Sequence, residues 1–109
     1  MMKKTIDNKV YNTETAIHVA GYWNGRGNPD PKNLSEDLYL SPKGQWFLSG
    51  EGGSLTKYSV PCGNGSSRGS DITLLTSDEA LAWVVANQKF IDNSDGVIDE
   101  HFKDKVTEG

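Results

Sequence analysis

Residues 37–53, with the sequence DLYLSPKGQWFLSGEGG, contain the strongest indication of the fold in this chain. Two runs that suit β-strands, Glu36–Leu40 and Gln45–Ser49, flank Ser41–Gly44, in which proline takes the second position of a tight turn. This pattern predicts a central β-hairpin. We expect Gly50–Gly53 to break the second strand. The hairpin residues expected to face the core are Leu38, Leu40, Trp46 and either Leu48 or Phe47, with Leu48 favoured.

The segment before the hairpin predicts two strands and a helix. Lys3–Ile6 and Val10–Asn12 suit short strands around a turn at Asp7–Lys9. Thr13 suits the N-cap of a helix, because its hydroxyl can accept a backbone N–H that lacks a helical partner, and Glu14 suits the first turn. The apolar residues that follow at helical spacing are Ala16, Ile17 and Ala20, with Val19 and Trp23 beside them.

A loop is expected between this helix and the hairpin. The helix should end at Gly21 or Gly25, because glycine commonly follows the last helical turn. Tyr22–Asn33 contains two glycines and two prolines, which disfavour regular structure. His18 is interpreted as a residue at the edge of the helix.

The segment after the hairpin returns to the sheet. Leu55–Val60 suits a short strand or a helical turn, and Cys62–Ser70 is a second loop rich in Gly and Ser. Asp71–Thr76 predicts another strand, with Ile72, Leu74 and Leu75 as its apolar residues.

Two helices are expected to close the chain. Thr76 and Glu79 have the spacing of a capping box, although Ser77 is an equally good N-cap. The side of the first helix that we expect to be buried carries Leu81, Val84, Val85 and Gln88, with Ala80 and Trp83 nearby. The second, acidic helix starts at Ser94 and Asp95 and carries Val97, Ile98 and Phe102. The prediction is a single α+β domain, residues 1–109, with a small, mostly antiparallel sheet around a central hairpin, one N-terminal helix and two C-terminal helices.

Composition and charge narrow the class of protein. The chain of 109 residues has one cysteine, 35% apolar residues and a net charge of −4. Residues 1–35 contain five cations and three carboxylates, whereas residues 77–109 contain three cations and eight carboxylates. Such a polarised domain can steer a charged partner toward one end. The basic start is not followed by the apolar run of a secretory signal, so we expect a cytoplasmic protein.

The glycine-rich and acidic segments do not fit the templates of common ligand sites. A phosphate-binding loop that starts at Gly50 meets Leu55 where its second glycine belongs. A calcium loop with Gly96 at its sixth position begins at Ile91 instead of an aspartate. Two histidines and one cysteine cannot build a zinc site of the usual spacing. The sequence therefore predicts no catalytic residues, no cofactor and no metal ion, and a protein that is not an enzyme.

Two surfaces are candidates for binding a macromolecule. An aromatic and basic patch that would suit nucleic acid consists of Trp23, Arg26, Lys57, Tyr58 and Arg68. The net negative charge opposes that interpretation, because binding to a phosphate backbone depends on clustered Lys and Arg. An acidic surface that would suit a cationic channel consists of Asp78, Glu79, Asp92, Asp95, Asp99, Glu100, Asp104 and Glu108.

Several phrases resemble a family of small proteins carried by bacterial plasmids, phages and integrative elements. The first is KVYNTETA at residues 9–16, followed by DLYL at 37–40 and KG at 43–44. The next is WFLSGEGG at 46–53, and LTKYS at 55–59 and LTSDEA at 75–80 complete the set. The most specific part is GEGG at 50–53 followed by the Lys-Tyr pair at 57–58, within the pattern WFLxGEGGxxxKY. Some members of this group resemble anti-CRISPR proteins. The resemblance implies a non-enzymatic inhibitor that binds an RNA-guided CRISPR effector nuclease, or its guide-RNA complex, in a bacterial host cell and blocks target binding or cleavage.

Alternative functions stay open at this point. One is a nucleic-acid-binding accessory protein of a mobile element, and another is a general protein-interaction module. We expect a monomer or a small homo-oligomer. The candidate partner-binding residues are Trp23, Arg26, Glu51, Lys57, Tyr58, Arg68, Asp95, Asp99 and Glu100. Glu51, the one charged residue among the glycines, is expected to form a salt bridge with Lys57 or with an arginine.

Overall fold

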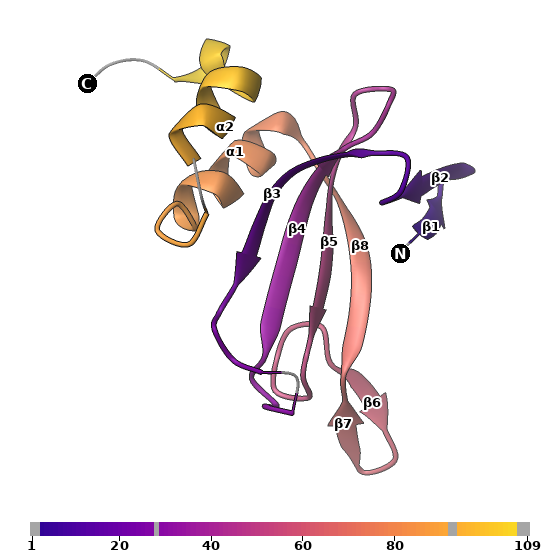
Figure 1. The fold of residues 1–109 in the computed structure, drawn as a ribbon. Coiled ribbons are helices and arrows are strands. Elements are labelled where there is room, and N and C mark those ends of the chain that lie inside the picture. The colour runs from indigo at the N-terminus through magenta and orange to yellow at the C-terminus, as the bar shows by residue number, and fades with distance from the viewer. Residues whose placement is uncertain (1–2, 28, 92–93, 107–109) are drawn as a thin grey trace.

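The computed structural model describes residues 3–27, 29–91 and 94–106, and the structural statements below concern these residues. The chain forms strands and two helices in the order shown in Figure 1. The strands are β1 (Lys3–Ile6), β2 (Lys9–Asn12), β3 (Ile17–Trp23), β4 (Leu34–Leu40), β5 (Trp46–Gly52), β6 (Val60–Cys62), β7 (Gly65–Ser67) and β8 (Gly69–Leu75). The helices are α1 (Ser77–Ala86) and α2 (Ser94–His101), followed by the 3₁₀ turn η1 (Lys103–Lys105).

The main sheet contains four antiparallel strands in the order β3-β4-β5-β8. Its centre is the β4–β5 hairpin, in which Leu40 pairs with Trp46. The Gly44 N–H donates to the Ser41 carbonyl at 2.9 Å, and Gly44 has a φ of +90°. A turn that ends on a left-handed glycine is a common three-residue hairpin connection. The predicted central hairpin and its turn are confirmed.

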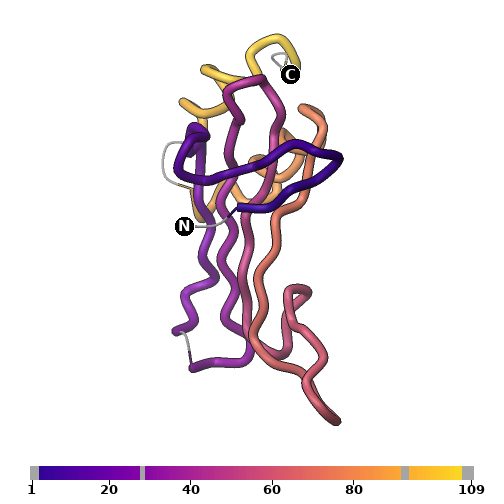
Figure 2. The backbone as a smooth tube through the Cα atoms, turned by 90° about the vertical axis from the view of Figure 1, so that its right-hand side faces the viewer, coloured from indigo at the N-terminus to yellow at the C-terminus, as the bar shows by residue number. Residues whose placement is uncertain are grey.

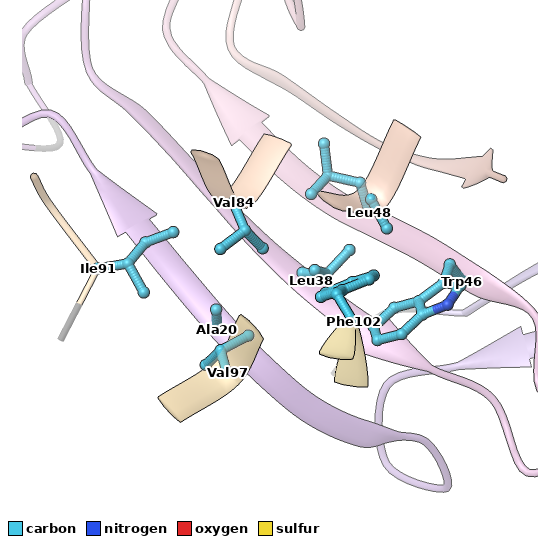
Figure 3. Close-up of a cluster of buried hydrophobic side chains, with 9 residues drawn as sticks. Ala20, Leu38, Trp46, Leu48, Val84, Ile91, Val97 and Phe102 are labelled. Atoms are coloured by element: carbon cyan, nitrogen blue, oxygen red, sulfur yellow. The ribbon is translucent and has the colours of Figure 1, made fainter. Parts of the chain in front are cut away.

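The two faces of this sheet are covered differently. On one face, Leu38, Trp46 and Leu48 pack in one cluster with Val84 of α1 and with Phe102, which directly follows α2 (Figure 3). On the other face, Phe47 and Ile72 pack with Tyr11. Figure 2 shows the β1–β2 hairpin crossing the strands near one end of the sheet. Both faces of β5 are therefore buried near Trp46, since Phe47 as well as Leu48 lies in a core cluster.

The N-terminal part contains the predicted strands but not the predicted helix. β1 and β2 pair antiparallel through a turn in which Asp7 and Asn8 both have positive φ, as such two-residue turns require. After Thr13 the chain makes a turn at residues 13–16 and then enters β3 instead of a helix. The predicted fold class is therefore wrong in this element: the described part of the α+β domain has helices at 77–86 and 94–101 and no N-terminal helix.

The turn at residues 13–16 has a local cause. Asn12 Oδ1 accepts the Glu14 N–H at 2.8 Å, and the Asn12 carbonyl accepts the N–H groups of Thr15 and Ala16. An Asn side chain that binds the backbone two residues later favours a turn over a continuing helix. β-Branched and aromatic residues then suit the edge strand β3, where Ile17 pairs with Leu40. Neither Gly21 nor Gly25 ends a helix, and Tyr22 and Trp23 belong to β3 rather than to the loop.

The expected strand break at Gly50–Gly53 is also wrong, because β5 continues to Gly52. A Cβ atom at Gly50 would overlap the ring of Tyr58, and one at Gly52 would overlap the Thr56 side chain. Residues 53–59, which we call the covering loop, pack on the strand at these points. The glycines thus permit the close approach of another segment. The covering loop is a series of turns, and the predicted loop after it contains the short β6–β7 hairpin.

Helix α1 begins with the predicted capping box. Thr76 Oγ1 accepts the Glu79 N–H at 3.1 Å, and Glu79 Oε1 accepts the Thr76 N–H at 2.9 Å. Ala80 and Val84 form the buried side of α1, whereas Val85 is exposed, contrary to expectation, because it lies on the other side of the helix. In α2 and directly after it, Val97 and Phe102 are buried, and Ile98 is partly buried.

Candidate functional site

A buried carboxylate lies between the sheet, the covering loop and α1. Glu36 is on β4, on the same face as Leu38, and its side chain is 5% exposed. Its Oε2 accepts the Tyr58 hydroxyl at 2.6 Å and the Lys57 ammonium at 2.7 Å. Its Oε1 accepts the Trp83 indole N–H at 3.1 Å. One side chain therefore joins three separate segments of the chain.

These donors decide the charge state of the site. Burial opposes ionisation of Glu36, but the hydrogen bonds from Lys57, Tyr58 and Trp83, together with the Lys57 charge, hold its pKa below the ordinary value. Burial, and next the hydrogen bond to Glu36, raise the pKa of the Tyr58 hydroxyl. Glu36 is consequently an anion and Tyr58 a neutral donor near pH 7. A buried carboxylate is tolerated when its lone pairs are used in this way.

A groove of about 690 Å³ runs beside this network. Its floor is formed by the sheet residues Leu48, Thr73 and Leu75. Ala82 and Trp83 of α1 and residues 57–60 of the chain form its walls. The volume lies within the range of small-ligand pockets, and a mostly apolar lining with a few polar groups is typical of binding sites. We call this feature the aromatic groove.

Two carboxylates, those of Asp71 and Glu79, are among the groups that line the groove. Asp71 Oδ1 accepts the Lys4 ammonium at 2.6 Å and the Ile72 N–H at 2.8 Å. The Lys4 hydrogen bond is the largest cause that lowers the pKa of Asp71. Glu79, which caps α1, is the other lining carboxylate. The groove thus combines aromatic side chains and acidic groups, a set that suits binding more than covalent chemistry.

The predicted aromatic and basic residues do not form one surface. Lys57 and Tyr58 meet at Glu36, where the Tyr58 ring is buried and unavailable for stacking on a base. Trp23, which is 57% exposed, donates its indole N–H to the Arg26 carbonyl at 2.8 Å. Arg26 in turn pairs with Asp30 at 3.2 Å. Of the two aromatic residues in the predicted nucleic-acid patch, only Trp23 is exposed enough to stack on a base.

The predicted salt bridge of Glu51 is made with an arginine. Arg68 Nη2 lies 3.5 Å from Glu51 Oε1, and the two side chains are 35% and 51% exposed. The alternative partner, Lys57, binds Glu36 instead, so that part of the hypothesis is wrong. The reason is strand geometry: Glu51 and its neighbour Gly50 face opposite sides of β5, and the covering loop lies on the Gly50 side.

Sequence reasoning missed Glu36 and the role of Trp83. One signal was present, because Glu36 precedes Leu38 and Leu40 at two-residue spacing and is therefore a charged residue on the apolar face of a strand. Such a residue requires partners. The indole donor comes from 47 positions further along the chain, a distance that local pattern cannot bridge.

The predicted acidic surface is divided between paired and unpaired groups. Asp95, Asp99 and Glu100 are exposed on α2, and within the described ranges no cation lies within 4 Å of the carboxylate of Asp95 or Asp99. Asp78 pairs with Lys105 at 2.7 Å, and Glu100 lies 3.8 Å from His101. Asp104 is exposed on η1. Asp92 and Glu108 lie outside the described residues.

Metal binding, membrane insertion and similarity to known proteins were considered in turn. Among residues 3–27, 29–91 and 94–106, there is no group of three or more His, Cys, Asp or Glu that could hold a metal ion. No helix in the described part of the chain is long and apolar enough to cross a membrane. Comparisons with protein-family models, with curated proteins and with solved structures found no match.

Proposed function

We propose that this protein inhibits an RNA-guided CRISPR effector nuclease by binding the effector or its guide-RNA complex. The proposal starts from the family resemblance of its motifs. The structural observation that supports it is the exposed acidic side of α2, where Asp95 and Asp99 lie one helical turn apart. In this proposal the protein acts by occupying a surface in the cytoplasm of a bacterial host, and catalysis has no part in it.

The charge of the partner gives the proposal its physical basis. RNA-guided nucleases hold the guide–target duplex in a positively charged channel and use arginines to read the motif beside the target. Carboxylates without an internal partner are free to form charge-assisted hydrogen bonds with such groups. Exposed charge pairs are screened by salt, so inhibition should weaken as ionic strength rises.

The test uses purified protein and a panel of guide-loaded effectors. For each effector, target binding and cleavage are measured with and without the protein. Inhibition of at least one effector supports the proposal, and unchanged activity across the panel contradicts it. A gel-shift assay with plain DNA and RNA runs in parallel, because a salt-dependent shift without any nuclease would favour a nucleic-acid-binding protein instead.

Charge variants then test the contact surface. Asp95→Asn/Asp99→Asn removes two negative charges from α2, whereas Asp7→Asn/Glu14→Gln removes two from exposed positions near the N-terminal hairpin. We expect the α2 variant to raise the half-inhibitory concentration about tenfold, as the loss of two exposed charge pairs implies. The matched control should change it little. Equal effects of the two variants would show that only net charge matters and would remove α2 from the proposed contact.

A further inference from the structure

The aromatic groove has walls that are fixed before any partner arrives. Tyr58 and Trp83 come from the covering loop and from α1, and both are held by the same Glu36 carboxylate at 2.6 and 3.1 Å. Both side chains line the groove. A pocket whose aromatic groups are already ordered loses less conformational entropy when a ligand binds. Such ordering distinguishes this groove from an incidental surface hollow.

The charges around the groove favour a cation. The Lys57 ammonium faces the Glu36 carboxylate at 2.7 Å, so its charge is already compensated. Lys4 compensates Asp71 in the same way at 2.6 Å. These two cations and the carboxylates of Glu36, Asp71 and Glu79 leave one net negative charge. Glu79 supplies it, and this residue is exposed.

The mode of binding is restricted by the edge of the sheet. β8 is an outer strand of the sheet, which usually offers its free N–H and C=O groups to an added strand. Here the Ile72 N–H donates to the side chain of Asp71, which Lys4 also holds. A strand added to β8 would have to displace this contact. A segment bound in the aromatic groove should therefore insert its side chains into the groove and form no backbone hydrogen bonds with β8.

We infer that the aromatic groove binds an arginine- or lysine-bearing protein segment that also carries an apolar residue. The apolar side chain rests on Leu48 and Leu75, and the cation lies beside Trp83 and the Glu79 carboxylate. A cation placed over a Trp ring is stabilised by its π electrons. This inference rests on the proposed function, since a nuclease with an arginine-lined channel is a partner of this chemistry.

The groove is tested without any nuclease, by titrating the full chain with two short peptides followed by NMR. The peptides are acetyl-Leu-Arg-Leu-amide and the same sequence with citrulline, which keeps the shape of arginine without its charge. We expect the arginine peptide to shift the Trp83 indole resonance and amides of residues 57–60 and 79–83. Its dissociation constant should be about fivefold lower than that of the citrulline peptide, as a cation–π contact implies.

Variants on one helix provide the matched control. Ala82 lines the groove and Ala86 does not, and both are exposed on α1. Ala82→Arg should abolish the peptide-induced shifts, whereas Ala86→Arg, with the same added charge, should leave them. Glu79→Gln keeps the capping box but loses the charge, so it should lower the preference for arginine over citrulline, and the part that the Trp83 ring provides should persist.

The outcomes separate this inference from the proposed function. Absent shifts, equal binding of the two peptides, or equal effects of Ala82→Arg and Ala86→Arg would overturn the groove inference, even if a nuclease is inhibited. Arginine-dependent binding in the groove together with no inhibition of any effector would support the groove and contradict the proposed function.

Discussion

Tyr58 Oη donates a 2.6 Å hydrogen bond to Glu36 Oε2, and Gly50, on the strand next to Glu36, leaves room for the tyrosine ring. Glu36 and Gly50 are directly paired across β4 and β5. The lysine before Tyr58 binds the same carboxylate. Gly50 and the Lys-Tyr pair, which belong to the most specific motif in this chain, therefore pack together around Glu36, which accepts the hydrogen bonds of Lys57 and Tyr58.

The Tyr58–Glu36 bond should appear as a coupling in a double-mutant cycle. Tyr58→Phe removes one hydrogen bond to a charged group and should lower the free energy of unfolding by roughly 1.5–3 kcal/mol. Glu36→Ala leaves the donors of Tyr58, Lys57 and Trp83 without their acceptor and should cost about 3–5 kcal/mol. Urea unfolding of the two single variants and the double variant gives the coupling energy. Additive effects, within about 0.5 kcal/mol, would show that the two side chains act independently.

Gly50→Ala should destabilise the fold because the new methyl group meets the Tyr58 ring. Overpacking of this kind typically costs about 1–3 kcal/mol. Gly65→Ala serves as the control, since nothing lies within 4 Å of a Cβ atom there and its φ is not in the left-handed region. Thermal unfolding by circular dichroism compares the two variants. Equal melting temperatures for both would contradict close packing of the covering loop on β5.

Stability should fall at acidic pH through Glu36. Its pKa in the folded protein lies below the ordinary value of 4.5, so the folded state binds fewer protons than the unfolded state. The contribution is complete above pH 4.5 and is lost as the pH falls through that value and then through the folded pKa. Urea unfolding between pH 7 and pH 3 measures this loss. Glu36→Gln should flatten the profile; Asp71 and Asp30, whose pKa values are also lowered, would leave a slope in the same direction.

The capping box should contribute measurably to α1. Thr76→Ala removes the oxygen that accepts the Glu79 N–H at 3.1 Å and should lower stability by about 1 kcal/mol. Thr76→Ser keeps that oxygen and should be close to wild type. Chemical denaturation of both variants at pH 7 measures their free energies of unfolding. Equal losses of stability would assign the effect to the lost methyl group rather than to the cap.

Local signals in the sequence were sufficient for some elements and not for others. The β4–β5 turn and the Thr76 cap were predicted because each depends on residues a few positions apart. Residues 13–20 carry helical spacing and a cap signal, yet Asn12 closes a turn and the free edge of β4 binds β3 through non-local hydrogen bonds. Tertiary pairing outweighs weak helix propensity in such a segment.

The candidate site was less accessible from the sequence than the fold. Lys57 and Tyr58 were identified, but their acceptor Glu36 was not, because the three residues meet only after the covering loop folds over Gly50. The groove combines residues of β5, β8, α1 and the covering loop, which no single stretch of sequence contains.

The most direct measurement of the proposed function is a stoichiometric titration of target cleavage. A guide-loaded effector at a fixed concentration well above the dissociation constant is preincubated with increasing amounts of the protein, and cleavage of a matched target is followed. We expect, for at least one effector, cleavage to fall linearly and to stop near one protein per effector. Unchanged cleavage by every effector tested, at a large molar excess of folded protein, would contradict the proposed inhibition.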